Sequence, residues 1–340
     1  MPVDAKPSTI AVVLAGGVAR GAFEAGVLQV LADTDLRVVR IVAASSGALS
    51  GTYFAAAIRA RRTRQAAREL AKLWRDHGGW QDVLHLSPRG ILQRRGFADT
   101  SRIRALLRKH IRPVVSADPA PINLRIIVSP VAGARGTIGD APATTYEHML
   151  EFDDADFDSQ AGLERVFTAA AASSSLPLLF TPTHVPGLGD CVDGGAVNNT
   201  PVEYALDDST GLPIDAAIVI TPTVAMKAPG SGRLISGQLL AQYIEMLINE
   251  RLYRDLRDIE RVNRALARLS ALPLDAGQLA AVKRALGWEH ARRLDVVPIR
   301  PLAPLPGTTL SGLLHRAERA ACIDIGITRA EQVLRGLGWR

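Results

Sequence analysis

Residues 10–28 read IAVVLAGGVARGAFEAGVL, and this stretch decides the fold of the chain. It begins with an apolar, β-branched run over 10–14, which is typical of a buried strand. A glycine-rich turn follows, and residues 22–32 are apolar at a spacing that predicts a helix. A second strand is expected over residues 38–43. The resulting β-α-β unit favours a mainly parallel sheet with helices on both faces.

Similar patterns continue along the rest of the chain. Strands are expected at 122–129, 216–221 and 294–299, and helices at 47–64 and 310–337. Two regions stand apart from this alternation. The acidic segment 143–164 is expected to form a surface loop or helix. Residues 231–290 have a pattern that predicts a helical insertion or cap.

Composition limits the class of protein. The chain has 340 residues and is 47% apolar, which is enough for one large α/β core or two modest ones. Two cysteines, Cys191 and Cys322, supply no disulfide framework, which points to a reducing compartment. No signal-peptide pattern is found, and no run reaches the roughly 18 apolar residues of a membrane span. We therefore expect a cytoplasmic protein, with peripheral membrane contact left open.

Positive charge is concentrated in one part of the chain. Between Arg59 and Arg112 there are fifteen Lys or Arg and four Asp or Glu, a net charge of +11 in a chain whose total is +6. Such a segment suits either anionic lipid headgroups or solvated helix faces. No nucleic-acid-binding motif accompanies it, so nucleic acid is not an expected partner. The acidic segment lacks the spacing and central glycine of an EF-hand, so no metal site is expected there.

A serine follows the second strand in a setting that suits a nucleophile. Residues 42–48 read VAASSGA, so Ala43 to Gly47 has the form A-x-S-x-G with Ser45 at its centre. Small neighbours allow a sharp strand-to-helix turn that exposes the serine hydroxyl. By itself the pattern is weak, because small residues at such junctions are also ordinary packing features.

A serine hydroxyl needs a base that takes its proton. Asp193 precedes Gly194 and Gly195, where the backbone can approach another element closely, although the same residues also suit an ordinary Asp-Gly turn. Histidine is the usual base, but His290 and His315, which follow Asp193, have no turn-like setting. Because the ordinary pKa of Asp is about 4, Asp193 needs burial or a shared hydrogen bond to act as a base at neutral pH.

The glycine-rich turn is the third candidate element. Unpaired backbone N–H groups at the start of a helix bind anions. Gly16 and Gly17 therefore suit either the phosphate of a nucleotide or a developing oxyanion. The spacing departs from G-x-G-x-x-G, which leaves nucleotide binding as the weaker alternative.

Four motifs, in this order, resemble those of the patatin-like phospholipases. They are residues 16–28, the turn at Ser45, residues 172–182 and residues 193–201. The resemblance spans about residues 10–201. It implies an α/β fold with three layers, α/β/α, and a mainly parallel central sheet. We expect a single patatin-like domain over residues 8–340, in which 231–290 is a helical insertion.

The resemblance also implies roles for individual residues. It implies a Ser-Asp dyad in place of a triad, with Ser45 as the nucleophile and Asp193 as the base. It implies an oxyanion hole at the backbone N–H groups of Gly16, Gly17 and Val18. The supporting residues of the same motifs are Arg20, Gly21, Ser46, Gly47, Gly194 and Gly195. The family usually has glycine where this chain has Val18 and Ala43, so strain is expected at both if the backbone there has a positive φ.

Together these expectations describe a serine esterase that acts on lipid acyl esters. It would be an enzyme of the phospholipase A or lysophospholipase type, would proceed through an acyl-enzyme, and would need no metal or cofactor. The alternative is a catalytically weak or silent lipid-binding protein that docks on anionic membranes through the Arg59–Arg112 segment. The lipid, the acyl position, the acyl acceptor and the oligomeric state are not determined by the sequence.

Overall fold

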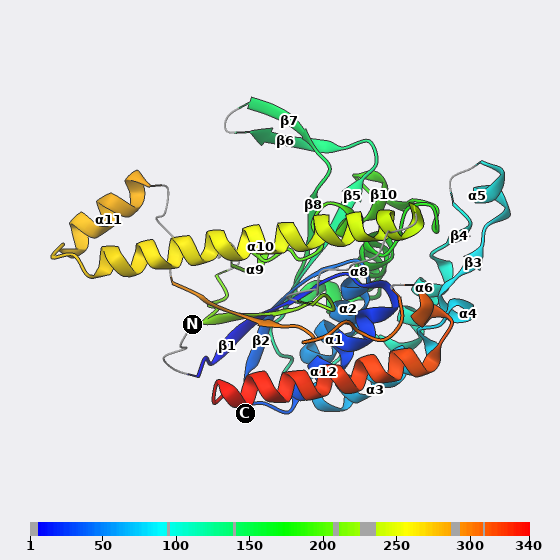
Figure 1. Cartoon of the computed structure of the whole chain (residues 1–340), viewed down its shortest axis with the longest axis horizontal. Coiled ribbons are helices and arrows are strands. Elements are labelled where there is room, and N and C mark those ends of the chain that lie inside the picture. The colour runs from blue at the N-terminus through cyan, green and yellow to red at the C-terminus, as the bar shows by residue number, and fades with distance from the viewer. Residues whose placement is uncertain are drawn as a thin grey trace.

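The structure is a computed structural model of the chain (Figure 1), and it describes residues 6–93, 96–138, 141–206, 211–224, 236–286, 293–308 and 310–340. Its main sheet has eight strands among these residues. They are β1 (Thr9–Leu14), β2 (Arg37–Ala44), β5 (Asn123–Pro130), β8 (His148–Phe152), β9 (Thr183–Val185), β10 (Gly189–Asp193), β11 (Ala216–Ile220) and β12 (Asp295–Ile299). Two small hairpins are separate: β3 (His85–Leu86) with β4 (Ala98–Asp99), and β6 (Ala134–Ile138) with β7 (Ala141–Thr145).

The sheet is parallel over most of its width. The order β12-β11-β1-β2-β5 is parallel throughout, and at the other edge β8 and β10 pair antiparallel with β5. Strand β9 then pairs antiparallel with β10. The register sets Leu14 beside Ala43, and Ala44 beside Ile127. The carboxyl ends of β1 and β2 therefore meet at one edge of the sheet, which is where ligands bind in open α/β sheets.

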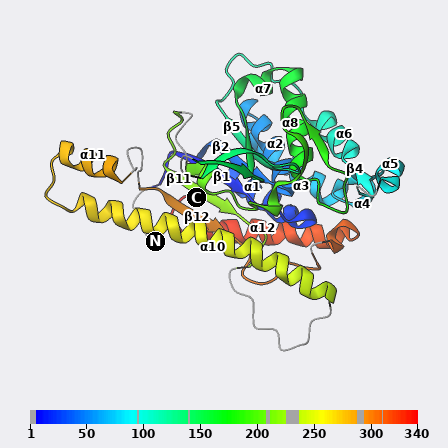
Figure 2. The ribbon, with the colours of Figure 1, turned by 90° about the horizontal axis from the view of Figure 1, so that it is seen from above.

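Helices cover both faces of the sheet, which confirms the expected α/β/α layers. The helices are α1 (Gly21–Ala32), α2 (Ser46–Arg59), α3 (Thr63–His77), α4 (Trp80–Val83), α5 (Pro88–Leu92), α6 (Ser101–His110), α7 (Asp154–Asp158), α8 (Gln160–Ser173), α9 (Glu203–Leu206), α10 (Ser236–Ser270), α11 (Ala276–Ala285) and α12 (Arg316–Gly336). Short 3-10 turns lie at η1 (Val18–Arg20), η2 (Gly194–Ala196) and η3 (Ser311–Leu313). Figure 2 shows α10 along one side of the sheet and α2 and α8 on the other.

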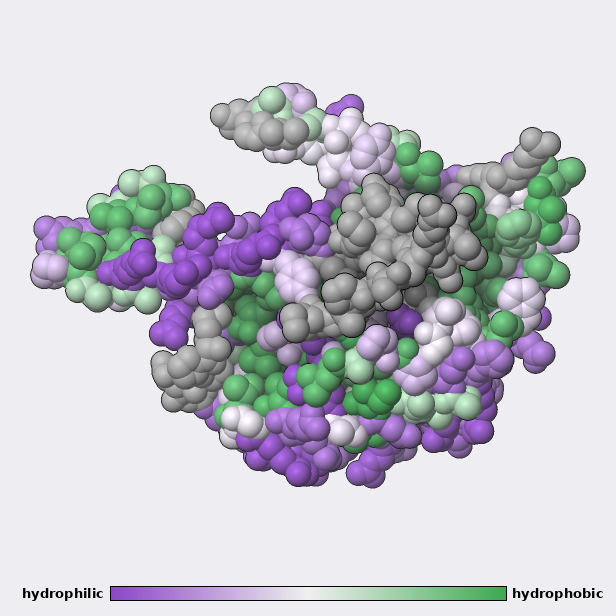
Figure 3. Space-filling model, viewed as in Figure 1, coloured by the Kyte–Doolittle hydropathy of each residue, from purple (hydrophilic) through white to green (hydrophobic). Residues whose placement is uncertain are grey.

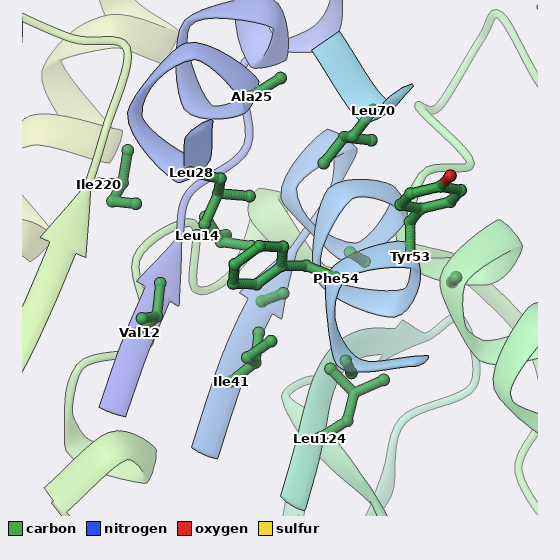
Figure 4. Close-up of a cluster of buried hydrophobic side chains, with 14 of the residues drawn as sticks. Val12, Leu14, Ala25, Leu28, Ile41, Tyr53, Phe54, Leu70, Leu124 and Ile220 are labelled. Carbon is green, nitrogen blue, oxygen red and sulfur yellow. The ribbon is translucent and has the colours of Figure 1, made fainter. Parts of the chain in front are cut away.

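Alternate residues of each strand face two different cores, as the pleat of a strand requires. Val12 and Leu14 belong to the larger core, together with Phe54 of α2 and residues of α1, α3, α8 and α12 (Figure 4). Ala11 and Val13 of the same strand belong to the smaller core, which Leu252 of α10 completes. Burial of both faces explains why these strands read as continuous apolar runs in the sequence.

Helix α10 accounts for much of the segment in which a helical insertion was expected. It has 35 residues, so it extends for roughly 50 Å, and α11 continues beyond the sheet (Figure 1). Its C-terminal part is tied to the residue before β12, because Asn263 Nδ2 donates to the Leu294 carbonyl at 2.7 Å. Residues 231–235 and 287–290 of the expected insertion, His290 among them, lie outside the described residues.

The acidic segment 143–164 forms the expected helix only in its second half, and its first half is mostly strand. It contains the end of β7, then β8, α7 and the start of α8. Strand β8 pairs antiparallel with β5 in the main sheet, and one of its acidic residues has a buried partner there. Arg125 of β5 has a fully buried side chain, and its Nε donates to Glu151 Oε1 at 2.9 Å. The Glu151 carboxylate, which the sequence pattern placed in solvent, therefore takes part in the contact between β5 and β8.

The helix expected over 47–64 is also interrupted. Helix α2 ends at Arg59 and α3 begins at Thr63. Between them Arg61 has φ 52°, a left-handed conformation that a continuous right-handed helix does not allow. Among the described residues, no helix is long and apolar enough to cross a membrane.

Candidate active site

Ser45 lies in the sharp turn between β2 and α2. Its backbone has φ 54° and ψ −131°, which is rare for a residue with a side chain and is typical of a nucleophile turn. The turn is held from both sides by α8 and the residue after it. The Ser45 N–H donates to Ser173 Oγ at 2.8 Å, and Ser174 Oγ donates to the Ser45 carbonyl at 2.9 Å. These bonds offset the strain and fix the direction of the Ser45 side chain.

Asp193 is the last residue of β10, and it faces Ser45. Ser45 Oγ donates to Asp193 Oδ2 at 2.6 Å, and the Gly195 N–H donates to Asp193 Oδ1 at 2.8 Å. The Asp193 backbone is fixed as well, because its N–H donates to the Ser175 carbonyl at 3.0 Å. Ser45 and Asp193 are both buried, with 6% and 3% exposure. The structure thus brings together the two residues that the sequence selected from segments 148 positions apart.

Burial sets the proton affinity of this carboxyl group. Loss of solvation raises the pKa of Asp193 to about 7, and the hydrogen bonds from Ser45 and the Gly195 N–H counteract only part of that rise. The group therefore exchanges a proton near neutral pH. An aspartate with the ordinary pKa of about 4 would be a weak base at this pH, whereas Asp193 can take and return a proton.

The glycine-rich turn lies beside Ser45, and its backbone is held by specific partners. The Gly16 N–H donates to the Asn199 carbonyl at 3.3 Å, and Asn199 Nδ2 donates back to the Gly16 carbonyl at 3.0 Å. A side chain at Gly16 would collide with Asn199 and with Ser45 Cβ, so only glycine allows this approach. The Gly17 N–H donates to Ser46 Oγ at 2.9 Å. Two of the three expected oxyanion donors are therefore engaged within the protein.

Val18 is the third of these donors and differs from the other two. Among the hydrogen bonds formed by described residues, none uses the Val18 N–H. Its backbone has φ 51°, so the expected strain is present at this position. Ala43 lies within β2 and is absent from the described residues with positive φ, so strain at Ala43 was a wrong expectation.

The remaining residues of the motifs surround this centre. Gly21 starts α1 against the Trp74 ring, Gly47 in the first turn of α2 lies against the end of β1, and Gly194 lies against the Ile127 carbonyl. Arg20 donates from Nη2 to the Gly307 carbonyl at 2.9 Å, so it connects the glycine-rich turn to the segment before α12. Arg20 does not line the pocket at Ser45.

Several residues of the site have roles that the sequence patterns did not assign. Ser173 and Ser174 hold the Ser45 backbone, and Asn199 bridges both polar groups of Gly16. All three belong to the quoted motifs. Their hydrogen bonds join segments that are distant in the chain, so a local pattern could not predict them. The only signal in the sequence was that several small hydroxyl and amide side chains occur together in these motifs.

Helix α10 is clamped to the loop that follows Asp193. Arg251 Nη1 donates to the Val197 carbonyl at 3.0 Å, and its Nη2 pairs with Glu147 at 3.0 Å and with Glu203 at 3.3 Å. Asn198 in the same loop donates to both carboxylates at 2.7 Å. The clamp therefore joins α10, the residue before β8 and the loop that follows Asp193.

A small pocket opens at Ser45. It is lined by Val18, Ser45, Ser46 and Asp193, and otherwise by mainly apolar side chains from α2, α3, α6 and residues 174–180. None of its described lining residues is a histidine. In the part of the chain that the structure describes, no group of three or more His, Cys, Asp or Glu side chains is arranged to hold a metal ion.

Comparison with known proteins identifies the class. The sequence profile of the patatin-like phospholipases matches residues 12–206, which is more than half of the chain and includes both Ser45 and Asp193. The chain belongs to this family. No curated protein matches the sequence.

Two solved structures are similar over most of the chain. VipD from Legionella pneumophila is 12% identical with a TM-score of 0.42, and the alignment covers 98% of this chain and 67% of VipD. The type III effector protein ExoU is 13% identical with a TM-score of 0.29, and the alignment covers 96% of this chain and 53% of ExoU.

Proposed function

We propose that the protein is a serine hydrolase that cleaves acyl esters of lipids, with Ser45 and Asp193 as a catalytic dyad. The observation that carries the proposal is the 2.6 Å hydrogen bond from Ser45 Oγ to Asp193 Oδ2 within the family's matching segment. A base must lie within hydrogen-bond reach of the proton that it removes, and this pair meets that condition. Membership of the patatin-like phospholipases supports lipid esters as the substrate class.

The reaction follows from the positions of these two groups. Asp193 takes the proton from Ser45 Oγ as the oxygen attacks the ester carbonyl carbon, and the carbonyl oxygen becomes an oxyanion. The carbonyl re-forms as the ester C–O bond breaks, and the leaving alcohol takes the proton from Asp193. In the second half Asp193 takes a proton from water, the hydroxide attacks the acyl-enzyme, and Ser45 recovers its proton as the fatty acid leaves.

The Val18 N–H supports the oxyanion in this proposal. Val18 lines the pocket with Ser45, and its N–H has no acceptor among the described residues. The amino end of α2 begins directly after Ser45, so its partial positive charge is also close to the developing negative charge. Gly16 and Gly17 contribute by fixing the turn through Asn199 and Ser46.

Two substitutions test the dyad. Ser45→Ala and Asp193→Asn should each reduce hydrolysis of a p-nitrophenyl ester by about 10⁴-fold. Only proteins with an intact Ser45 should be labelled by a fluorophosphonate. Ser116→Ala and Asp35→Asn change exposed residues outside the pocket and are the matched controls. Equal activity in wild type and the two dyad variants would contradict the proposal.

Contact with a membrane surface is proposed as part of this function. Part of the positive charge of the basic segment is neutralised at the surface, because Arg59, Arg61 and Arg108 pair with Asp158, Asp118 and Glu164 from outside it. An apolar surface favours the contact instead. Leu92 and Leu178 are 86% and 83% exposed, and the α5 end of the molecule carries hydrophobic surface in Figure 3.

This apolar end is linked directly to the pocket at Ser45. Phe97 and Ala98 donate their N–H groups to the Leu179 carbonyl, and Leu179 lines the pocket. Sedimentation with neutral and anionic phospholipid vesicles tests the contact. Leu92→Asp should reduce binding to both vesicle types. If added salt removes all binding and Leu92→Asp has no effect, the basic segment is the docking surface instead.

A further inference from the structure

A second cavity adjoins the pocket at Ser45. Both cavities are lined by Leu49, Trp74, Gly78, Val83 and Ile103. The second cavity lies in the helical layer on the side away from the nucleophile, because its other lining residues come from α2, α3 and α6 and none belongs to the dyad or the glycine-rich turn. The two cavities therefore share a wall, and the nucleophile lines only one of them.

The second cavity suits a hydrocarbon chain. Its lining includes Leu70 and Leu73 of α3 and Leu106 and Leu107 of α6, and none of its described lining residues is Asp, Glu, Lys or Arg. Its volume of about 90 Å³ is several times the roughly 10–15 Å³ that one water molecule needs on this measure. An apolar space of this kind gains free energy when an alkyl chain fills it.

Polar groups at the edge of this cavity are neutral or already bonded. The Tyr53 hydroxyl donates to Glu69 Oε2 at 2.8 Å. Burial lowers the pKa of His110, so this imidazole is neutral at neutral pH. Figure 4 shows Tyr53 and Leu70 projecting from neighbouring helices α2 and α3. Neither group introduces a charge that a buried alkyl chain would have to displace.

Trp74 lies at the junction between the two cavities. Its indole N–H donates to Ser50 Oγ at 2.9 Å, and its ring packs beside Gly21 at the start of α1. The polar edge of the ring is thus bonded to α2, and the ring has a fixed position in the wall that the two cavities share. An alkyl chain that begins at Ser45 would pass this ring to reach Leu70.

We propose that the second cavity holds the acyl chain of the substrate and limits its length. The proposal rests on the proposed function, because Ser45 must carry the acyl group at the near end. Leu70 to His77 of α3 line the cavity over roughly 10 Å. A straight chain of roughly eight to ten carbons has that extent. The preferred substrates are accordingly esters of medium-length, unbranched fatty acids.

Hydrolysis of p-nitrophenyl esters from C2 to C16 tests the length limit. In wild type, kcat/KM should rise by about threefold for each added methylene up to C8 or C10 and then level off or fall. Leu106→Trp fills the second cavity, so the ratio of kcat/KM for C10 to that for C4 should fall at least about tenfold. Leu70→Ala should move the maximum to longer chains. Leu302→Trp is the matched control, because Leu302 is exposed and lines neither cavity.

Binding of decanoate to the Ser45→Ala protein gives a second readout that does not need catalysis. Calorimetry should detect binding of decanoate but not of acetate, and Leu106→Trp in the same background should abolish it. A chain-length profile with the same shape in Leu106→Trp and wild type would overturn the proposal, as would unchanged decanoate binding. Absence of hydrolysis at every chain length, with decanoate binding intact, would contradict the proposed function and leave the acyl site standing.

Discussion

The Oγ atom of Ser45 lies 2.6 Å from Oδ2 of Asp193, inside a site where both side chains are almost completely buried. The hydrogen bond that Ser45 donates favours the charged carboxylate of Asp193, whereas burial favours the neutral acid. Burial has the larger effect, since the pKa of Asp193 is raised to about 7. Protonation of one carboxyl group near neutral pH therefore has consequences for both activity and stability.

Activity should depend on pH through this group. Asp193 can accept the Ser45 proton only as a carboxylate, so kcat/KM should rise with pH, bend near pH 7 and fall by about tenfold per unit well below it. The measurement is kcat/KM for a short p-nitrophenyl ester between pH 5 and pH 9. A profile that is flat from pH 5 to pH 8 would contradict Asp193 as the base.

Stability should have the opposite pH dependence at this residue. A carboxyl group whose pKa is raised on folding contributes its stabilisation below its unfolded pKa, and loses it as the pH rises through the folded value. For Asp193 the window runs from 3.8 to about 7, and the loss is on the order of 4 kcal/mol at its upper end.

Asp193→Asn removes this loss and retains an oxygen that can accept from the Gly195 N–H. The variant should exceed wild type in free energy of unfolding by about 2–4 kcal/mol at pH 8, and the difference should shrink towards pH 4. Urea titrations at the two pH values measure it. The exposed control Asp35→Asn should not give a difference that grows between pH 4 and pH 8. A pH-independent difference for Asp193→Asn would contradict the assignment.

Val18→Gly should stabilise the protein. A β-branched residue at φ 51° costs about 1–2 kcal/mol, and the greater freedom of glycine in the unfolded chain offsets about half of the gain. The expected net increase in the free energy of unfolding is about 1 kcal/mol. Val18→Ala keeps a Cβ at the same φ and should gain less. Activity should stay within about tenfold of wild type, because the proposed donor is the backbone N–H. Destabilisation by Val18→Gly would indicate that the valine side chain contributes more through packing.

Arg251→Met should destabilise the protein and lower kcat. The substitution leaves Glu147 and Glu203 beside each other without their shared cation, and it releases the Val197 carbonyl. Because Arg251 is partly exposed, the expected loss is about 1–3 kcal/mol. Arg257→Met on the same helix is the control, since its pair with Glu250 is exposed on both sides. Equal effects of the two substitutions would exclude a specific role for the clamp.

The parallel part of the fold could be predicted because its signals are local. Strands β1, β2, β5 and β11 are buried on both faces and β12 is half-buried, and each appears in the sequence as a mainly apolar run that ends in a turn. The antiparallel edge has no comparable signal. β9 has three residues and β10 has five, and their pairing with each other and with β5 depends on contacts between distant segments.

The same distinction applies to the site. Ser45 could be selected because a strand-to-helix turn with small neighbours is a local pattern, and Asp193 could be paired with it only through the family's ordered motifs. The hydrogen bonds of Gly16 and Gly17 were not predictable, because their acceptors Asn199 and Ser46 lie on other segments. Ion pairing of the Arg59–Arg112 segment could not be predicted for the same reason, since the acidic partners of Arg59 and Arg108 come from elsewhere in the chain.

The antiparallel β9–β10 hairpin has a consequence for the kinetics of folding. Ser45 belongs to the first β-α-β unit, which contains mostly short-range contacts, whereas its partner is 148 residues away on an edge hairpin. Closing such a long loop is slow compared with forming local structure. During refolding, helical circular dichroism should therefore recover before reactivity towards a fluorophosphonate. The nucleophile would stay inert in a newly made chain until β10 has joined the sheet beside β5.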